Sequence, residues 1–376
     1  MTDLDAVTLA VFGYPRRRLL GALMRHWLAR PLPDLDDLPV PDGAESFVRW
    51  AARCVAGPEG DADAELRQAG QIARRALVAG RALGQRPVSI GATEYPAALR
   101  EIPDPPPLLW LRGRIEALHE ARLVAVVGAR AASRQGLEVA MAIGGGLAAA
   151  GVVVVSGLAR GVDTAAHRAA IDAGGRSVAV LGSGLDRIYP PEHALLADAL
   201  IERGALVSEY LPGTPPLSYH FPLRNRIISG LTAATVVVEA SEKSGSLITA
   251  GAALEQGREV MAVPGSVATG RHRGAHALLR DGATLVERAE DVLAALGWAS
   301  PDATPGAPAG PALDPALAAE LGLPPGTDDF GPDDVAAGTG WTLAEVGARL
   351  GVLEISGRIS RIAGGRFVGS RNRVLT

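Results

Sequence analysis

Seven short runs of apolar and often β-branched residues constrain the fold of this chain more than any other feature. They read LVAVVGA (123–129), GVVVVSG (151–157), SVAVLGS (177–183), ALVSEY (205–210), ATVVVEA (234–240), EVMAVPG (259–265) and ATLVE (283–287). Segments with helical patterns, such as TAAHRAAIDAG and EHALLADALIERG, separate most of the runs. Nearly continuous apolar strands that alternate with helices are typical of a parallel sheet covered by helices on both faces. The sequence therefore predicts an α/β fold for residues 86–297.

The regions on either side of this sheet domain have different patterns. Residues 1–85 carry apolar positions at helical spacing in LLGALMRHWLA and AELRQAGQIARRALVAGRAL, which predicts a helical accessory domain. Residues 298–312 form a linker rich in Pro, Ala and Gly. In residues 313–376, two short helices flank Gly338-Thr339-Gly340, and two strands joined at Gly364-Gly365 follow them. This order of elements predicts a winged-helix-like domain.

Composition narrows the class of function. The net charge of −4 argues against a generally basic nucleic-acid-binding protein, so any contact with nucleic acid must come from local clusters. The single cysteine, Cys54, provides no disulfide framework and no thiolate metal site, which suits a reducing cytoplasm. Residues 139–159 are uncharged over a membrane-spanning length, but five glycines divide them into a helix end and a buried strand. We therefore expect a cytoplasmic protein with no membrane insertion.

Six of the seven predicted strands end in Gly, Ser or small polar residues. Examples are Gly128 after the first run and Ser156-Gly157 after the second. In an open parallel sheet, ligands bind beyond the carboxyl ends of the strands. Glycine lets a ligand approach the backbone closely, and the amides at helix N-termini attract anions. The pattern indicates a long groove for a phosphate-bearing ligand.

The common nucleotide and metal motifs are absent from the sequence. The loop from Gly128 to Gly136 lacks the G-x-G-x-x-G spacing of dinucleotide-binding proteins, and no G-x-x-x-x-G precedes Lys243-Ser244 as a P-loop requires. His272 and His276 have metal-like spacing but no evident third ligand. We therefore expect neither a cofactor nor a metal.

Four other polar residues carry expectations of their own. Asp163 is expected to cap a helix and His167 to pack within it. Glu209 and Glu239 end two strands near the groove, where we expect them to orient arginines. They are also the candidate general bases if the protein is an enzyme.

The stretch SYHFPLRNRIISG (218–230) combines Phe221, Arg224, Asn225 and Arg226 with no acidic residue. Arginines neutralise phosphates, and an exposed aromatic ring is a stacking platform for an unpaired base. We interpret the stretch as a loop that contacts nucleic acid. The alternative is a loop in which Phe221 belongs to the core and the arginines are solvated.

A second loop, Lys243-Ser244-Gly245-Ser246, precedes a predicted helix. Small hydrogen-bond donors before a helix are typical of an anion-binding helix start. Plain N-capping by Ser244 or Ser246 is the other interpretation, and both can hold at once. Lys243 is the only lysine in the chain, which favours contact with phosphate.

Several of these motifs occur in an order that resembles a known family. The segments VVGAR (126–130), SGLARGVDTAAH (156–167), VLGSGLDRIYP (180–190), SEY (208–210), FPLRNRIISGL (221–231), KSGSLITA (243–250) and AVPG (262–265) are similar to the DNA-processing protein A (DprA/Smf) family. The resemblance implies an extended Rossmann-like parallel sheet core, a helical, SAM-like N-terminal domain and a C-terminal winged helix. It also implies a non-catalytic homodimer, formed through the Rossmann-like domain, that protects incoming single-stranded DNA and loads RecA recombinase during natural transformation.

On matching positions, the resemblance implies a DNA-binding pocket. Its residues would be Arg130, Ser156, Gly157, Phe221, Arg224, Asn225, Arg226, Lys243, Ser244, Gly245 and Ser246. The chain departs from the family at Ala129, where Ser is common, and at His276, where Asn is frequent. The alternative function is that of a Rossmann-like nucleoside monophosphate hydrolase, but those enzymes carry a PGG-type loop where this chain reads KSGSLITA.

Overall fold

The structure of the chain is a computed structural model. The structure describes residues 3–13, 51–52, 62–298, 313–324, 326–327, 329–356, 358–361 and 366–369. The chain divides into two compact units, residues 1–299 and 300–376.

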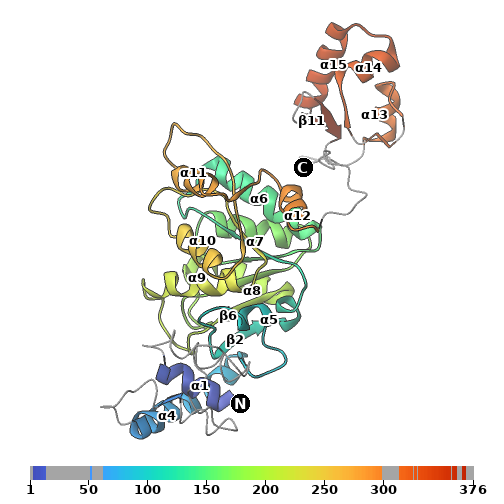
Figure 1. The fold of residues 1–376 in the computed structure, drawn as a ribbon. Helices are drawn as coiled ribbons and strands as arrows, with labels where there is room; N and C mark the ends of the chain where they lie inside the picture. The colour runs from blue at the N-terminus through green and yellow to red at the C-terminus, as the bar shows by residue number, and fades with distance from the viewer. Residues whose placement is uncertain are drawn as a thin grey trace. The chain divides into compact units, whose positions relative to one another are not determined.

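A nine-stranded sheet forms the centre of the first unit (Figure 1). All seven predicted strands are present as β3 (Leu123–Val127), β4 (Val153–Ser156), β5 (Ser177–Val180), β6 (Ala205–Ser208), β7 (Ala234–Val237), β8 (Glu259–Ala262) and β9 (Thr284–Leu285). These seven strands are parallel to one another. Every residue of β3 and β4 is buried, as the continuous apolar runs predicted.

Two further strands, β1 (Arg86–Ser89) and β2 (Leu108–Gly113), were not among the predicted runs. They pair antiparallel with each other, and β2 pairs antiparallel with β6. The strand order is β1-β2-β6-β5-β4-β3-β7-β8-β9. The order therefore reverses between β3 and β7: the chain builds outward from β3 to β6 on one side and from β7 to β9 on the other.

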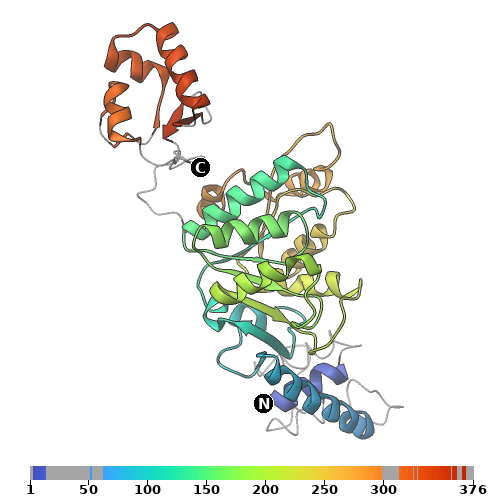
Figure 2. The same cartoon turned by 180° about the vertical axis from the view of Figure 1, so that it is seen from behind.

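Helices cover both faces of the sheet. They are α5 (Ala97–Arg100), α6 (Arg134–Ala149), α7 (Val162–Asp172), α8 (Ala194–Arg203), α9 (His220–Gly230), α10 (Ser246–Glu255), α11 (Arg273–Arg280) and α12 (Ala289–Ala295). The helices α9 and α10 lie in front of the sheet in Figure 1, whereas α6, α7 and α8 face the viewer in Figure 2. Alternate residues of β3 supply the two cores: Val124 and Val126 pack with α6 and α7, and Ala125 and Val127 pack with α9 and α10.

The N-terminal helices α1 (Asp3–Gly13) and α4 (Ala62–Ala82) pack beside β1 and β2. Ala73 and Ala76 of α4 share a buried cluster with Trp110 of β2. The AELRQAGQIARRALVAGRAL prediction is thus confirmed as a helix, whereas LLGALMRHWLA lies outside the described residues. A separate domain over residues 1–85 stays a prediction.

The second unit has the predicted winged-helix arrangement. Its elements are α13 (Pro315–Glu320), β10 (Asp329–Phe330), α14 (Pro332–Thr339), α15 (Leu343–Ile355), β11 (Ile359–Arg361) and β12 (Phe367–Gly369), with strand order β10-β12-β11. Gly340 ends α14 in the left-handed conformation, at φ 76°. Thr342 and Glu345 then form a capping box that starts α15. The turn expected at Gly364-Gly365 and the linker residues 299–312 lie outside the described residues.

Across the described ranges, no helix is both long enough and apolar enough to span a membrane. The uncharged stretch 139–159 divides between α6 and β4, as expected.

His167 of α7 is a buried neutral imidazole. Ser177 donates its hydroxyl proton to the Val154 carbonyl over 2.6 Å, so His167 Nδ1, at 2.7 Å, must donate to Ser177 Oγ. Its Nε2 atom is therefore unprotonated, and it is buried without a partner. Burial lowers the pKa of His167 to about 3.

We predict that His167 makes the folded state less stable in acid. Below about pH 6.5 the imidazole of His167 takes up a proton in the unfolded chain but stays neutral in the folded chain. Its contribution to the free energy of unfolding is therefore present above pH 6.5 and is lost as the pH falls toward 3. Between pH 7 and pH 5, the fall should be about 2 kcal/mol smaller in His167→Asn than in the wild-type chain. Urea unfolding at the two pH values measures it, and equal pH dependence of the two proteins would contradict the prediction.

Candidate nucleic-acid interface

A pocket of about 560 Å³ opens at the carboxyl edge of the sheet. Loops that follow β3, β4, β7 and β8 contribute to it, together with α9 and α10. Its lining residues are Val127, Gly128, Ala129, Arg130, Ala131, Ala159, Asp163, Phe221, Pro222, Arg224, Asn225, Ile228, Glu239, Ser241, Ser244, Gly245, Ser246, Ile248, Thr249 and Arg271. The pocket lies where the strand order reverses, which is where open α/β sheets form a ligand crevice.

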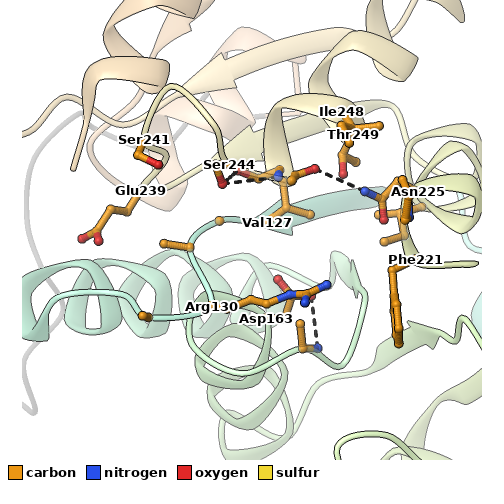
Figure 3. Close-up of a pocket in the computed structure, with 18 of the residues that line it drawn as sticks. Val127, Arg130, Asp163, Phe221, Asn225, Glu239, Ser241, Ser244, Ile248 and Thr249 are labelled. Carbon is orange, nitrogen blue, oxygen red and sulfur yellow. Dashed lines mark hydrogen bonds between the residues drawn. The ribbon is translucent and has the colours of Figure 1, made fainter. Parts of the chain in front are cut away.

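Arg130 and Phe221 face each other across part of this pocket. The Arg130 side chain is exposed and extends from the loop after β3 toward the Phe221 ring, which points in from α9 (Figure 3). The guanidinium carbon lies 5.4 Å from the ring centroid, within the range of a cation–π contact. An exposed guanidinium of this kind can bind a phosphate while the aromatic ring limits its orientation.

Arg224 and Asp163 form a buried polar centre in the pocket wall. Arg224 donates from Nη1 to the Gly157 carbonyl over 3.0 Å. Asp163 accepts from the Gly157 amide at 3.0 Å and the Ala159 amide at 3.3 Å. A Cβ at Gly157 would lie 2.6 Å from Arg224 Nη2 and 2.9 Å from Asp163 Oδ2. Glycine at this position therefore makes room for both charged groups.

Burial shifts both pKa values of this centre toward the neutral forms. It lowers the pKa of Arg224 to about 10, and the negative charge of Asp163 opposes the shift. It raises the pKa of Asp163, although Arg224 and the two backbone amides favour the carboxylate. Arg224 keeps its positive charge at neutral pH, so it adds to the field in the pocket without being exposed.

The start of α10 closes a second side of the pocket. Asn225 of α9 donates from Nδ2 to the Gly245 carbonyl over 3.3 Å. The hydroxyl oxygens of Ser244 and Ser246 lie 2.7 Å apart and share a hydrogen bond. Gly245 takes the N-cap position, and no side chain caps the helix. The Ser244 hydroxyl oxygen accepts a hydrogen bond from the Ser246 amide over 3.4 Å, so Ser244 contacts the first turn of α10 although it does not occupy the N-cap position.

Glu239 connects three loops at the far side of the pocket. Its carboxylate accepts from the Ser133 amide at 3.2 Å and from the Ser133 hydroxyl at 2.5 Å. Arg271 lies 3.5 Å from Glu239 and donates to the Ala131 carbonyl over 2.9 Å. The Arg271 side chain is half exposed, so a second arginine stands at the pocket's edge.

Seven of the residues predicted from sequence line the pocket: Arg130, Phe221, Arg224, Asn225, Ser244, Gly245 and Ser246. Four do not. Ser156 is buried and donates to the Val126 carbonyl over 2.7 Å, and Gly157 lies behind the wall. Lys243 is exposed to solvent and does not line the pocket, and Arg226 lies on a side of α9 that faces away from the pocket lining. The binding role of all eleven residues stays a prediction.

The interpretation of residues 218–230 as a loop is wrong, because His220–Gly230 is the helix α9. Helical periodicity separates neighbours in sequence, so Arg224 and Arg226 point in different directions. Arg226 is buried and bonds both oxygens of Glu209 at 2.8 and 2.7 Å, and its Nε lies 3.0 Å from Asp104. Glu209 thus orients an arginine as expected, but that arginine is buried and lies outside the pocket lining.

Three charged residues of the pocket lining, Asp163, Glu239 and Arg271, were not predicted as binding residues. Asp163 was expected only as an N-cap, yet Gly161 occupies that position and the Asp163 carboxylate reaches back to the preceding turn. Glu239 was expected only to orient arginines. Arg271 follows β8 at the same sheet edge as the other loops, and a search for basic residues after every strand would have found it. Across the described ranges, no group of three His, Cys, Asp or Glu residues is placed to hold a metal ion.

The fold and pocket define a Rossmann-like α/β protein joined to a winged-helix domain. Residues 86–297 match the family described as DNA recombination-mediator protein A, and residues 300–365 match the DprA winged helix domain. The chain therefore belongs to the DNA-processing protein A (DprA/Smf) family.

Similar proteins agree with this assignment. Protein Smf of Escherichia coli (strain K12) is 45% identical over 283 residues, which are 72% of this chain and 74% of the relative. DNA processing protein DprA of Streptococcus pneumoniae (strain ATCC BAA-255 / R6) is 48% identical over 200 residues, or 53% of this chain and 70% of the relative.

Two solved structures share the fold. The X-ray structure of DprA from Streptococcus pneumoniae superposes with a TM-score of 0.65 at 36% identity and covers 78% of this chain and 98% of that one. The structure describing the single-stranded DNA binding mode of DNA processing protein A from Helicobacter pylori gives a TM-score of 0.52 at 25% identity and covers 56% and 95%.

We predict that Arg226 contributes to stability. Arg226→Met would leave Glu209 and Asp104 buried without their cation and should lower the free energy of unfolding by about 3–5 kcal/mol. Arg187→Met is the matched control, because Arg187 pairs with Asp186 at 3.4 Å but is 61% exposed. That change should cost less than about 1 kcal/mol. Urea unfolding compares the two variants, and equal losses would show that Arg226 is not a buried structural charge.

Proposed function

We propose that this chain binds single-stranded DNA in the pocket at the carboxyl edge of the sheet. The observation that carries the proposal is the exposed guanidinium of Arg130, held 5.4 Å from the Phe221 ring at the reversal of strand order. A cation beside an aromatic ring is the combination that binds the phosphates and unpaired bases of single strands.

The charges of the pocket favour a polyanion although two carboxylates line it. Asp163 accepts two backbone N–H groups, and Glu239 accepts the amide and hydroxyl of Ser133. Amide dipoles therefore partly neutralise both carboxylates. Three arginines, Arg130, Arg224 and Arg271, outnumber them. The Helicobacter pylori protein, whose structure describes single-stranded DNA binding, has the same fold.

We further propose that the chain acts as a homodimer through its Rossmann-like domain, protects incoming single strands and transfers them to RecA recombinase during natural transformation. Family membership supports these steps. Binding without chemistry is part of the same proposal. The absence of chemistry is supported by the hydrogen bonds that occupy the polar groups of the pocket. The Ser244 and Ser246 hydroxyls share a hydrogen bond, and the Glu239 carboxylate accepts one from the Ser133 hydroxyl.

We predict that Arg130 contacts a backbone phosphate. Arg130→Ala should weaken binding of oligothymidylate, and the slope of log K against log salt concentration should become shallower by about 0.7, the value for one phosphate on a single strand. Arg134→Ala is the matched control, because Arg134 is 93% exposed on α6 and lies outside the pocket. Fluorescence-anisotropy titrations at several salt concentrations give both slopes.

An unchanged slope in Arg130→Ala, or an equal change in Arg134→Ala, would contradict the pocket assignment. Loss of binding in both variants would indicate diffuse attraction by surface charge.

The alternative of nucleoside monophosphate hydrolysis is tested separately. We predict that the protein releases free base from nucleoside monophosphates no faster than buffer alone does. The reason is that the Glu239 carboxylate already accepts hydrogen bonds from the amide and hydroxyl of Ser133. Chromatography of the incubated nucleotides measures release. Base release by the wild-type chain that disappears in Glu239→Gln would show an enzyme.

A further inference from the structure

Tyr189 is an exposed aromatic residue beside the pocket. Among the aromatic side chains that the structure describes, Tyr189 and Tyr219 are the exposed ones, at 42% and 55%. Tyr189 belongs to the segment between β5 and α8 and is not part of the pocket lining. Its ring centroid lies 5.6 Å from that of Phe221, with 45° between the ring planes. Tyr219 instead contacts the buried His220.

Hydrogen bonds hold the Tyr189 segment against the pocket wall. Glu192 pairs with Arg160 at 2.6 Å, and His193 Nδ1 lies 2.9 Å from the Leu158 carbonyl. Both partners belong to the loop after β4, which lines the pocket through Ala159. The segment that carries the Tyr189 ring is therefore attached to the β4 loop at two points, Leu158 and Arg160. The position of the ring beside Phe221 is thus defined before any ligand binds.

The two rings differ in what they offer a ligand. Arg130 already faces the Phe221 ring at 5.4 Å. Among the residues that the structure describes, no cation faces the Tyr189 ring, which keeps an exposed surface. The carboxylates nearest to it in sequence are also engaged, since Asp186 accepts from the Gly213 amide at 2.8 Å and Glu192 pairs with Arg160. An aromatic surface of this kind, next to a cation, suits an unpaired nucleobase.

We propose that Tyr189 forms a second subsite, which stacks the base adjacent to the nucleotide held at Arg130 and Phe221. This inference rests on the proposed binding of single-stranded DNA. It extends the bound strand beyond the pocket, over Phe221 and toward the segment between β5 and α8. A purely structural role, in which Tyr189 only covers the edge of Phe221, makes a different prediction.

The experiment compares Tyr189→Leu, which removes the ring but keeps an apolar side chain, with Tyr189→Phe, which keeps the ring. Each protein is titrated with oligothymidylates of increasing length, from the dinucleotide upward. The shortest oligomer that binds should bind all three proteins equally. Longer oligomers should bind Tyr189→Leu more weakly, on the order of ten-fold, and Tyr189→Phe like the wild-type chain. Urea unfolding of the three proteins confirms that each is folded.

Three results would overturn the inference. Equal binding of Tyr189→Leu and the wild-type chain at every length would show that the ring contacts no base. An equal loss at every length, including the shortest oligomer, would show that Tyr189 acts only by packing on Phe221. Binding of no oligomer by the wild-type chain would remove the proposed function itself, and the inference with it.

Discussion

The reversal of strand order between β3 and β7 is the constraint on which the pocket depends. Parallel pairing places the carboxyl ends of both strands at one edge, and the chain leaves them in opposite directions. Gly128 lets the loop after β3 pack closely against α7, since a Cβ there would lie 2.6 Å from Val162 Cγ2. The polar lining then comes from the loops after β3, β4, β7 and β8.

Charged side chains in this region fall into two groups with different physical roles. Arg224, Arg226, Asp163 and Glu239 are buried, and each is held by backbone or side-chain partners that offset the cost of removing a charge from water. Arg130 and Arg271 stay exposed at the opening. The buried set belongs to the wall, whereas Arg130 and Arg271 present guanidinium surface to solvent at the opening. This separation supports a surface that binds a charged polymer reversibly.

The sequence predicted the parallel strands well because burial on both faces leaves long apolar runs, and β3 to β9 all coincide with such runs. It did not predict β1 and β2, since an antiparallel pair joined by eighteen residues lacks the alternation with helices that identified the others. Residues 218–230 were misread for a related reason. The mixture of aromatic, basic and polar residues suggested a loop, but in the helix α9 these residues lie on different sides.

The sequence by itself determined the α/β fold, the winged-helix unit, the family and the loops that meet at the sheet edge, because these depend on local periodicity and on motifs read in order. Only the tertiary structure decided which charged residues face the pocket. Arg224 and Arg226 are two positions apart, yet the first lines the pocket while the second pairs with Glu209 and Asp104. That difference arises from helix geometry and from partners distant in sequence, and neither can be seen in a run of letters.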